Sequence, residues 1–409
     1  MTGLMPRTII HLDLDAFFCA VEELNNPGLR GRAFAVGGRP EERGVVASCS
    51  YVARKFGIRS AMPMARAVKL CPELLIISSH HSIYSKISQQ VMERIRRLTP
   101  LVEQVSIDEA FMDATGLPPD GLQVARTLQA NIREELKLPS SLGVATNKLV
   151  AKIATDVGKA SARMNSSTQE PAGIDSQSLA SYPNAITMVP CGQEADFLAP
   201  LPVEMLWGVG PKTAARLSDL GVTTIGDLAQ YPVSELKRVF GKIGIELSSH
   251  ARGLDDSPII TQSETKSISQ ETTFARDIRS EQALHQTLLE LSTRVGRRLR
   301  QAGLQGTTVK IKLRWPDFTT LTRQVTLAQP TDQESQIFTA SLQLFSQVWV
   351  PGKAVRLLGV GVSGLGPIIR QLSLWDETYE REHRLNAAID SLWEKFGPGI
   401  IQRGGVKSR

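Results

Sequence analysis

Residues 10–22 read Ile10-His11-Leu12-Asp13-Leu14-Asp15-Ala16-Phe17-Phe18-Cys19-Ala20-Val21-Glu22, and this stretch decides the fold. Its apolar first half predicts a buried strand that ends in carboxylates. Burying an ionised carboxylate is costly unless a positive charge compensates it. Because the stretch contains no Lys or Arg, a bound cation is the natural partner. Phe17 and Phe18 follow at once and offer rings against which a flat ligand could pack. The alternative is that Asp13 or Asp15 only caps the helix that comes next.

The chain as a whole is basic and long enough for several domains. Its 409 residues predict two to four domains, and a net charge of +6 with a pI of about 9.2 favours a polyanionic partner. Cys19, Cys49, Cys71 and Cys191 lack metal-ligand spacing and predict buried thiols in a reducing compartment. The sequence shows no signal-peptide segment and no window of transmembrane length, so we expect a cytoplasmic protein.

A second informative stretch runs from Ser50 to Ile58. Ser50 is a plausible helix N-cap, and Tyr51 and Arg54 lie three residues apart, on one face of the helix that follows. A phenol and a guanidinium on one face could bind a polyphosphate, because Arg offers forked donors that match phosphate oxygens. The alternative is a surface Arg packed over a Tyr ring.

An adjacent pair of acids, Asp108 and Glu109, lies at the junction of two short strands predicted between Leu101 and Asp113. Adjacent strand residues point to opposite faces, so both carboxylates can reach one metal site only where the backbone bends or bulges. A solvated turn is the alternative, and the apolar flanks of the pair argue against it.

A helix is predicted over Asn147–Lys159, directly after an apolar strand. Its residues Lys148, Lys152 and Lys159 form either a solvated face or the basic wall of a phosphate site.

The stretch Leu206–Ala215 has the pattern of a helix-hairpin-helix motif, with Pro at the start of a helix. Gly208 and Gly210 let backbone N–H groups approach a DNA phosphate, and Lys212 adds positive charge. A simple helix-terminating turn is the alternative.

The C-terminal part begins after a linker predicted at Ala251–Pro258. A strand, a helix over Glu281–Gln301 and two further strands follow. Basic and apolar residues alternate in one of these strands, so Lys310, Lys312 and Arg314 share a face, and Arg323 lies on the probable partner strand. The pattern predicts a module that contacts a duplex backbone.

Near the end, Gln371-Leu372-Ser373-Leu374-Trp375 resembles the pentapeptide with which bacterial proteins bind the sliding clamp. Leu374 and Trp375 could fill an apolar pocket while the Gln371 amide pairs with its rim. The alternative is that these residues pack back on their own domain. About thirty-four residues follow, so the motif is internal.

Taken together, the stretches around Asp13, Ser50 and Asp108 resemble the Y-family DNA polymerases of the DinB branch, and the resemblance extends through the helix-hairpin-helix to about Leu327. The resemblance implies an α+β multidomain right-hand polymerase with a ferredoxin-like palm, small fingers, a helical thumb and an α/β little finger. The implied bounds are palm 1–32 and 79–172, fingers 33–78, thumb 173–252, linker 253–263, little finger 264–366 and C-terminal tail 367–409.

The resemblance also implies functional residues. Asp13, Asp108 and Glu109 would hold two Mg²⁺ ions, with the Leu14 carbonyl as a further ligand, whereas Asp15 is not a ligand in the family pattern. Phe18 takes the steric-gate position that excludes a 2′-hydroxyl. The residues implied to bind the nucleotide are Phe17, Phe18, Ala47, Ser48, Tyr51, Arg54 and Lys159.

The chain departs from the family pattern after Lys159, where relatives commonly continue with Lys-Pro-Asp-Gly or Lys-Pro-Asn-Gly. Here the sequence is Lys159-Ala160-Ser161-Ala162-Arg163, and Arg163 is a possible substitute at the γ-phosphate.

The implied activity is low-fidelity, template-directed DNA synthesis past lesions, by a monomer without proofreading. Its partners would be primer-template DNA, deoxynucleoside triphosphates and a sliding clamp. A nucleotidyl cyclase would explain the acids but not the helix-hairpin-helix, and a catalytically silent DNA-binding scaffold is a third possibility.

Overall fold

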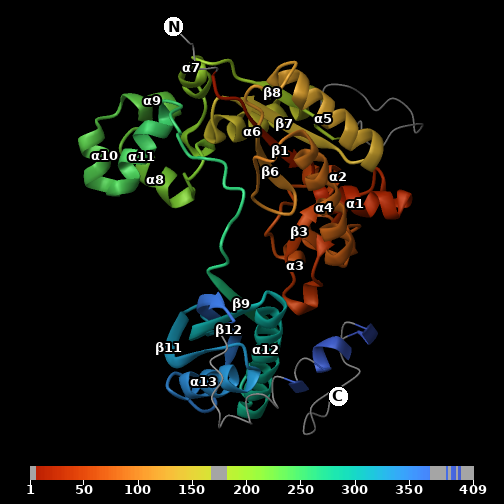
Figure 1. The fold of residues 1–409 in the computed structure, drawn as a ribbon, viewed down its shortest axis with the longest axis vertical. Coiled ribbons are helices and arrows are strands. Elements are labelled where there is room, and N and C mark those ends of the chain that lie inside the picture. Colours follow the sequence, from red (N-terminus) through yellow and green to blue (C-terminus); the bar gives the residue numbers. More distant parts are fainter. Residues whose placement is uncertain (1–5, 167–181, 369–383, 386–387, 393–394, 398–409) are drawn as a thin grey trace. The chain divides into compact units, whose positions relative to one another are not determined.

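The computed structural model describes residues 6–166, 182–368, 384–385, 388–392 and 395–397. The chain divides into two compact units, Met1–Ser263 and Glu264–Arg409, each with its own apolar core (Figure 1). Both units combine helices with largely antiparallel sheets, which confirms the predicted α+β class.

The first unit is built on a five-stranded sheet in the order β5-β6-β1-β7-β8. β1 lies at its centre and pairs antiparallel with β6 on one side and β7 on the other. The strands are β1 (Ile9–Leu14), β5 (Val102–Gln104), β6 (Glu109–Asp113), β7 (Ser140–Ala145) and β8 (Ile186–Met188). The opening stretch of the sequence is thus the middle of the sheet, as its apolar run predicts.

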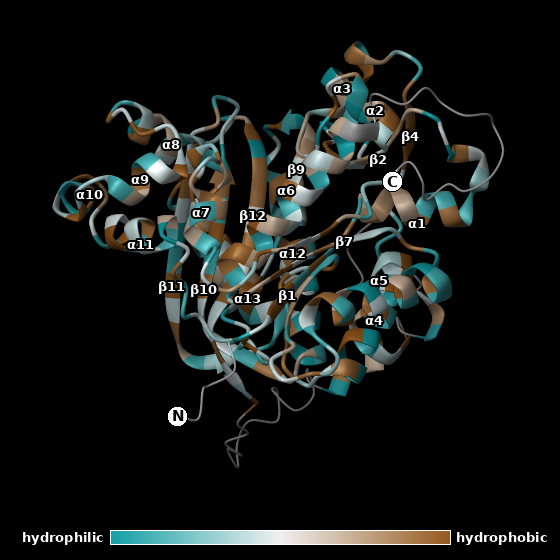
Figure 2. Cartoon of the chain, turned by 90° about the horizontal axis from the view of Figure 1, so that it is seen from above, coloured by the Kyte–Doolittle hydropathy of each residue, from teal (hydrophilic) through white to brown (hydrophobic). Residues whose placement is uncertain are grey.

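Alternation along β1 divides the core between the two faces of this sheet. Ile10, Leu12 and Leu14 belong to the core that α4 (His81–Leu98) and α5 (Gly121–Leu136) cover. Ile9 packs in a second core with α6 (Lys148–Ser166). His11 and Asp13 therefore face the side of α6. In Figure 2 the strands around β1 carry hydrophobic residues, while hydrophilic residues cover the outer turns of α4 and α5.

A smaller sheet of three strands, in the order β3-β2-β4, follows β1 and α1 (Phe17–Asn25) in the chain. Its members are β2 (Phe34–Gly37), β3 (Val46–Cys49) and β4 (Leu75–Ile77), with helices α2 (Tyr51–Lys55) and α3 (Met64–Leu70) beside them. Ser50 caps α2 as predicted, because its side chain accepts a hydrogen bond from the backbone N–H of Ala53. The helix predicted after Ser50 is confirmed.

A helical region completes the first unit. It contains α7 (Glu194–Leu198), α8 (Pro211–Ser218), α9 (Ile225–Gln230), α10 (Val233–Phe240) and α11 (Lys242–Ala251). Thr224 and Asp227 form a capping box at the start of α9. Beyond α11, the Gly253 carbonyl and the Asp255 carboxylate accept hydrogen bonds from residues at the start of α6. This part of the predicted linker therefore packs against the first unit.

The second unit is a four-stranded antiparallel sheet in the order β11-β10-β12-β9 with two helices packed on one face. Its elements are β9 (Ser267–Ile278), α12 (Glu281–Gln301), β10 (Leu304–Arg314), β11 (Thr320–Thr331), α13 (Glu334–Ser346) and β12 (Val355–Pro367). Val309, Ile311 and Leu313 of β10 are buried beneath the helices, which confirms the alternation read from the sequence.

The cysteines differ in their exposure. Cys19, Cys49 and Cys71 are buried free thiols, but Cys191 is exposed, so that part of the prediction is wrong. Cys191 follows β8 in a turn ahead of α7, where no core forms around it.

None of the helices in the described part of the chain has the length and apolar composition needed to cross a membrane.

Candidate active site

Three acidic residues lie at one end of β1 and β6. Asp13 and Glu109 are directly paired in the antiparallel register, so their side chains lie on the same face of the sheet. Asp108 immediately precedes β6, and its carbonyl accepts a 3.0 Å hydrogen bond from the N–H of Leu14. The two strands thus bring the backbones of Asp13, Leu14, Asp108 and Glu109 together, and the role of these residues as metal ligands stays a prediction.

The backbone bends just before Glu109, where the sequence analysis expects a bend or bulge at the adjacent acids. Residues 106–108 lie outside the strand ladder, and the N–H groups of Val105 and Ser106 both donate to the Glu109 carbonyl, at 3.0 and 3.2 Å. The Ser106 hydroxyl donates to Asp108 Oδ1 at 2.6 Å and accepts from the Asp108 N–H at 3.3 Å. This tight turn is what frees Asp108 from the alternation of a regular strand.

Lysines of α6 neutralise these acids. Lys159 forms an ion pair with Asp13 and lies 3.3 Å from Asp15, and Lys152 forms an ion pair with Glu109. The two lysines are seven residues apart, which is two helical turns, and so project from one face of α6. Lys148 differs: it is buried and binds Glu103 at 2.7 Å and the Pro258 carbonyl at 3.3 Å, so it anchors the linker.

The ion pairs and burial shift the pKa values of these groups. Burial raises the pKa of Asp13 to about 6, although the Lys159 ammonium opposes the change. Burial would also raise the pKa of Glu109, but His11 and Lys152 outweigh it and lower that pKa to about 2. Desolvation lowers the pKa of Lys159, and Asp13 and Asp15 more than reverse this, so it is raised overall. Asp13 is therefore the member of the set most dependent on a nearby cation.

His11 is a site neighbour to which the sequence analysis gave no role. It is fully buried, with Nδ1 at 2.9 Å from Thr155 Oγ1 and Nε2 at 3.3 Å from Glu109 Oε1. A proton on Nε2 points at the Glu109 carboxylate, which is how His11 lowers the pKa of Glu109, and the Thr155 hydroxyl then faces Nδ1 as a donor. The sequence could have indicated this position, because His11 and Asp13 are two residues apart on one strand and so lie on the same face.

The Asp15 carboxylate accepts hydrogen bonds from neighbouring residues. Ser141 Oγ donates to its two carboxylate oxygens at 2.9 and 3.1 Å, and the Asn184 N–H donates at 3.1 Å. These bonds occupy the carboxylate, in keeping with the expectation that Asp15 is not a metal ligand.

The Phe18 ring is half-buried and held by aromatic neighbours. It stacks on Tyr84 with ring centres 4.3 Å apart, and His81 meets it edge-on at 6.0 Å. The Tyr84 hydroxyl donates to Glu22 at 2.5 Å, which fixes that ring in turn. Phe17, by contrast, is buried in the core.

Two of the predicted nucleotide-binding residues, Tyr51 and Arg54, cluster with Arg163. Tyr51 lies between two guanidiniums: Arg54 is 4.5 Å and Arg163 is 5.1 Å from its ring centre. Arg163 also donates to the Tyr51 hydroxyl at 3.3 Å. Arg54 thus packs over the Tyr51 ring, as the alternative reading expects, and Arg163 adds a second positive charge. The reading in which this pair binds a polyphosphate stays a prediction. On β3, Ser48 is buried and Ala47 is exposed.

The donor set fits a hard divalent cation. Within the described ranges, no group of three or more His, Cys, Asp or Glu side chains is arranged to enclose a metal ion. The carboxylates of Asp13, Asp108 and Glu109 are nevertheless the oxygen ligands that Mg²⁺ prefers. The ammonium groups of Lys159 and Lys152 lie on the carboxylates of Asp13 and Glu109 and supply positive charge there.

The helix-hairpin-helix residues lie as the motif requires. Gly208 has a φ of 95°, a conformation that favours glycine, and Gly210 caps α8 with Pro211 at its first position. Among the described residues, no atom comes within 4 Å of a side chain built at either glycine, so the backbone there is open. Lys212 is exposed beside them.

The sheet of the second unit separates the predicted basic residues. Lys310, Lys312 and Arg314 lie on the face opposite the helices, where Lys312 pairs with Glu271 at 2.9 Å. Arg323 is paired in register with Ile311, a core residue, so it belongs to the helix-covered face. The sequence analysis named the strand of Arg323 but not its face, and the register of β10 with β11 assigns that face.

The pentapeptide Gln371–Trp375 lies outside the described residues.

Comparison with known proteins agrees with this architecture. Residues 12–156 match the impB/mucB/samB family, 265–374 its C-terminal domain, and 204–255 the DNA polymerase-iota thumb domain. The chain is 41% identical to DNA polymerase IV of Desulfatibacillum aliphaticivorans, with 96% of this chain and 95% of that protein covered. DNA polymerase IV of Dehalococcoides mccartyi is 39% identical, with 97% of each covered.

The fold also matches a solved structure. A Y-family DNA polymerase chimera of Dbh and Dpo4 superposes with a TM-score of 0.74 at 23% identity, covering 89% of this chain and 100% of the chimera. The right-hand polymerase architecture is therefore confirmed. With carboxylates at the centre of its sheet, a helix-hairpin-helix thumb and relatives named DNA polymerase IV along nearly its whole length, the chain belongs to the impB/mucB/samB family of Y-family DNA polymerases.

Proposed function

We propose that this DNA polymerase extends a primer 3′ end with deoxynucleotides by two-metal phosphoryl transfer, at low fidelity and across damaged templates. The observation that carries the proposal is the direct pairing of Asp13 with Glu109 beside the bend that holds Asp108. Asp13, Asp108, Glu109 and the Leu14 carbonyl would hold two Mg²⁺ ions. Such ions supply a lowered pKa at the primer hydroxyl and stabilise the charge on the phosphates.

The chain's own residues would prepare the substrates. Lys159 and Lys152 keep the carboxylates ionised before substrate arrives, and the positive cluster of Tyr51, Arg54 and Arg163 would hold the triphosphate. Lys159 reaches both Asp13 and Asp15 and would also be able to contact a phosphate oxygen of the nucleotide. Its positive charge offsets carboxylates that are costly to leave buried and unpaired.

Sugar and base selection would follow from the rest of the site. The Phe18 ring, braced by Tyr84, is suited to lie under the sugar and exclude a 2′-hydroxyl. Ala47 is small and exposed, which would leave a loose roof over the templating base and tolerate lesions. Nothing in the sequence resembles a proofreading exonuclease, so errors would persist.

The domain plan is proposed on the same grounds. The five-stranded sheet with α4, α5 and α6 would be the palm, the three-stranded sheet the fingers, the helices α7–α11 the thumb, and the second unit the little finger. Gly208, Gly210 and Lys212 of the thumb, with Lys310, Lys312 and Arg314 of the little finger, would contact DNA phosphates. The pentapeptide residues Gln371, Leu372, Leu374 and Trp375 would bind a sliding clamp.

A primer-extension assay with Asp108→Ala tests the proposal. The variant should lose at least about a thousandfold in Mg²⁺-dependent extension, since a missing ligand removes charge stabilisation from the transition state. It should bind primer-template DNA as the wild type does, because Asp108 is not among the proposed phosphate contacts. Extension near the wild-type rate would reject the assignment, and it would favour a scaffold whose acids are structural.

A further inference from the structure

His11 is a fully buried imidazole in contact with both Glu109 and α6. In the register of the sheet it stands opposite Phe111 of β6, so it is the diagonal neighbour of Glu109 on the same face. Its ring packs on the Phe111 ring, with ring centres 4.6 Å apart and an angle of 51° between the planes. Packing of the two rings therefore restricts how the imidazole can turn.

The two ring nitrogens of His11 face different elements. Nδ1 lies 2.9 Å from Thr155 Oγ1 on α6, and Nε2 lies 3.3 Å from Glu109 Oε1. A carboxylate only accepts hydrogen bonds, so the proton belongs on Nε2, and Nδ1 accepts from the Thr155 hydroxyl. The Nε2 distance exceeds the roughly 2.9–3.0 Å of a typical N–H···O bond. Among the described residues Nε2 has no other hydrogen-bond partner, so its proton is available to Glu109.

The contact between His11 and Thr155 depends on a glycine in the next strand. Gly143 of β7 stands opposite His11 in the register. A Cβ at Gly143 would lie 2.7 Å from Thr155 Oγ1 and would collide with the Ala151 carbonyl, so glycine lets α6 approach the sheet this closely. Thr155 follows Lys152 by three residues, which places both on the side of α6 that covers the acids. The packing thus places a hydroxyl behind the imidazole.

The two donors beside Glu109 approach the same carboxylate oxygen. Lys152 forms its ion pair with Oε1, and His11 Nε2 also lies against Oε1. Within the described ranges of the chain, no hydrogen bond reaches Oε2. The protein therefore engages one oxygen of this carboxylate and leaves the other without a partner from those ranges.

We propose that His11 is a positioning residue for the polymerase reaction: backed by Thr155, it donates from Nε2 to Glu109 Oε1 and leaves Oε2 to bind metal. The inference rests on the proposed function, because it requires Glu109 to be a metal ligand. A carboxylate held at one oxygen loses less freedom when it binds a cation, so it binds more tightly. Removing a hydrogen-bond donor of this kind from a metal ligand typically costs about 10–100-fold in metal affinity.

Two variants that differ in reach test the proposal. The amide nitrogen of His11→Gln is as many bonds from Cβ as Nε2 is, whereas the amide of His11→Asn ends near the place of Nδ1 and is too short for Glu109. Both variants lose the ring that packs on Phe111, so each controls for the packing of the other. Mn²⁺ binding is measured on the complex with primer-template DNA and a deoxynucleotide, with a primer that lacks its 3′-hydroxyl. His11→Asn should weaken Mn²⁺ binding at least about tenfold, and His11→Gln no more than about threefold.

A double-mutant cycle shows whether His11 acts through Glu109. In the Glu109→Gln protein there is no carboxylate to position, so adding His11→Asn should leave the Mn²⁺ affinity within about twofold. Equal losses in the wild-type and Glu109→Gln backgrounds would overturn the proposal. Equal losses in His11→Asn and His11→Gln would also overturn it, because they would report the missing ring and not the missing donor.

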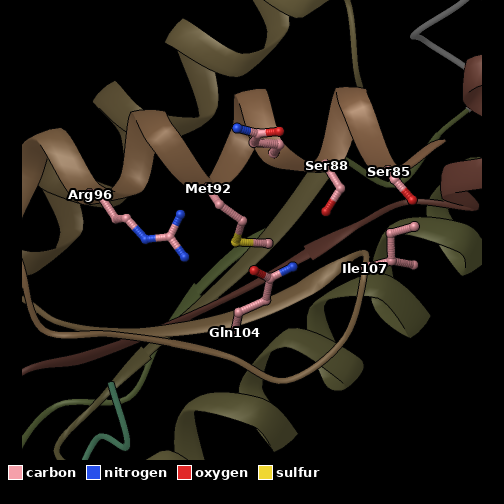
Figure 3. A pocket seen from close by; sticks show the side chains of 7 residues that line it. Ser85, Ser88, Met92, Arg96, Gln104 and Ile107 are labelled. Carbon is pink, nitrogen blue, oxygen red and sulfur yellow. The ribbon is translucent and has the colours of Figure 1, made fainter. Parts of the chain in front are cut away.

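Thr155→Val and Ser88→Ala form a matched pair, since each removes one buried hydroxyl beside the five-stranded sheet. Thr155 lies behind His11 on the α6 face, whereas Ser88 projects from α4 on the other face, toward Gln104 and Ile107 (Figure 3). Thr155→Val should weaken Mn²⁺ binding about three- to tenfold, the effect of one hydrogen bond. Ser88→Ala should bind Mn²⁺ as the wild type does, and equal effects of the two changes would remove Thr155 from the arrangement and overturn the proposal.

Failure of this proposal is distinguishable from failure of the proposed function. Wild-type extension by Glu109→Gln would overturn both, because Glu109 would then not be a metal ligand. Loss of extension in Glu109→Gln, together with wild-type Mn²⁺ affinity in His11→Asn, would overturn the positioning role of His11 alone.

Discussion

Asp13 of β1 stands directly opposite Glu109 of β6 in the antiparallel ladder, with both side chains on the face that α6 covers. Two carboxylates so placed repel each other unless positive charge lies between or beside them. The structure supplies that charge from Lys159 and Lys152. Asp13 and Glu109 are therefore each neutralised by a lysine ammonium, and carboxylates that need a positive partner are suited to binding metal ions.

Phe18→Ala should admit ribonucleotides. The stacked Tyr84 ring holds Phe18 in one position, so truncation opens a gap that the neighbours do not fill. We expect the preference for deoxynucleotides over ribonucleotides to fall at least about tenfold in kcat/KM, equal to ~1.4 kcal/mol, with a smaller effect on deoxynucleotides themselves. Phe318→Ala, which removes an exposed ring in the second unit, is the control. An unchanged sugar preference in Phe18→Ala would move the gate to another residue.

Arg163→Gln should weaken triphosphate binding. Arg163 lies on the Tyr51 ring beside Arg54 and stands where relatives carry a different turn. Loss of one charge-assisted hydrogen bond predicts an increase in the KM for deoxynucleotides of about tenfold, with kcat less affected. Arg163→Lys should restore part of the loss because it keeps the charge. Arg126→Gln, an exposed change on α5, should have no effect. Equal KM values in Arg163→Gln and Arg126→Gln would remove Arg163 from the site.

Neutralising Lys310, Lys312 and Arg314 together should weaken DNA binding for all sequences alike. The log–log salt slope should flatten by about 0.9 for each DNA phosphate that the variant no longer neutralises. Arg323→Gln is the internal control, since register places Arg323 on the helix-covered face, and we expect it to leave the slope unchanged. If Arg323→Gln flattens the slope as much as one of the other three changes, the open face of the sheet is not the DNA-binding surface.

Much of the architecture followed from local sequence patterns. The apolar run before Asp13 predicted the central strand, Ser50 predicted the start of α2, and alternation predicted the basic face of β10. Each of these features depends on neighbours within a few residues, which is the range over which period and capping act.

Features that depend on distant residues were not predictable in the same way. The ion pairs of Lys152 with Glu109 and of Lys159 with Asp13 join residues from separate elements, and the sequence analysis left the lysines open between a solvated face and a phosphate wall. The face of Arg323 was decided by its register with Ile311. The position of His11 against Glu109 likewise depends on how β1 and β6 align.

The most direct test of the central claim is to count the metal ions that these acids hold. Mn²⁺ binding would be measured on the complex with primer-template DNA and a deoxynucleotide, using a primer that lacks its 3′-hydroxyl. Two ions per complex are predicted for the wild type, and fewer than two for Asp108→Ala and Glu109→Gln at the same free metal concentration. Two ions in all three proteins, bound with equal affinity, would contradict the assignment of Asp13, Asp108 and Glu109 as the metal site.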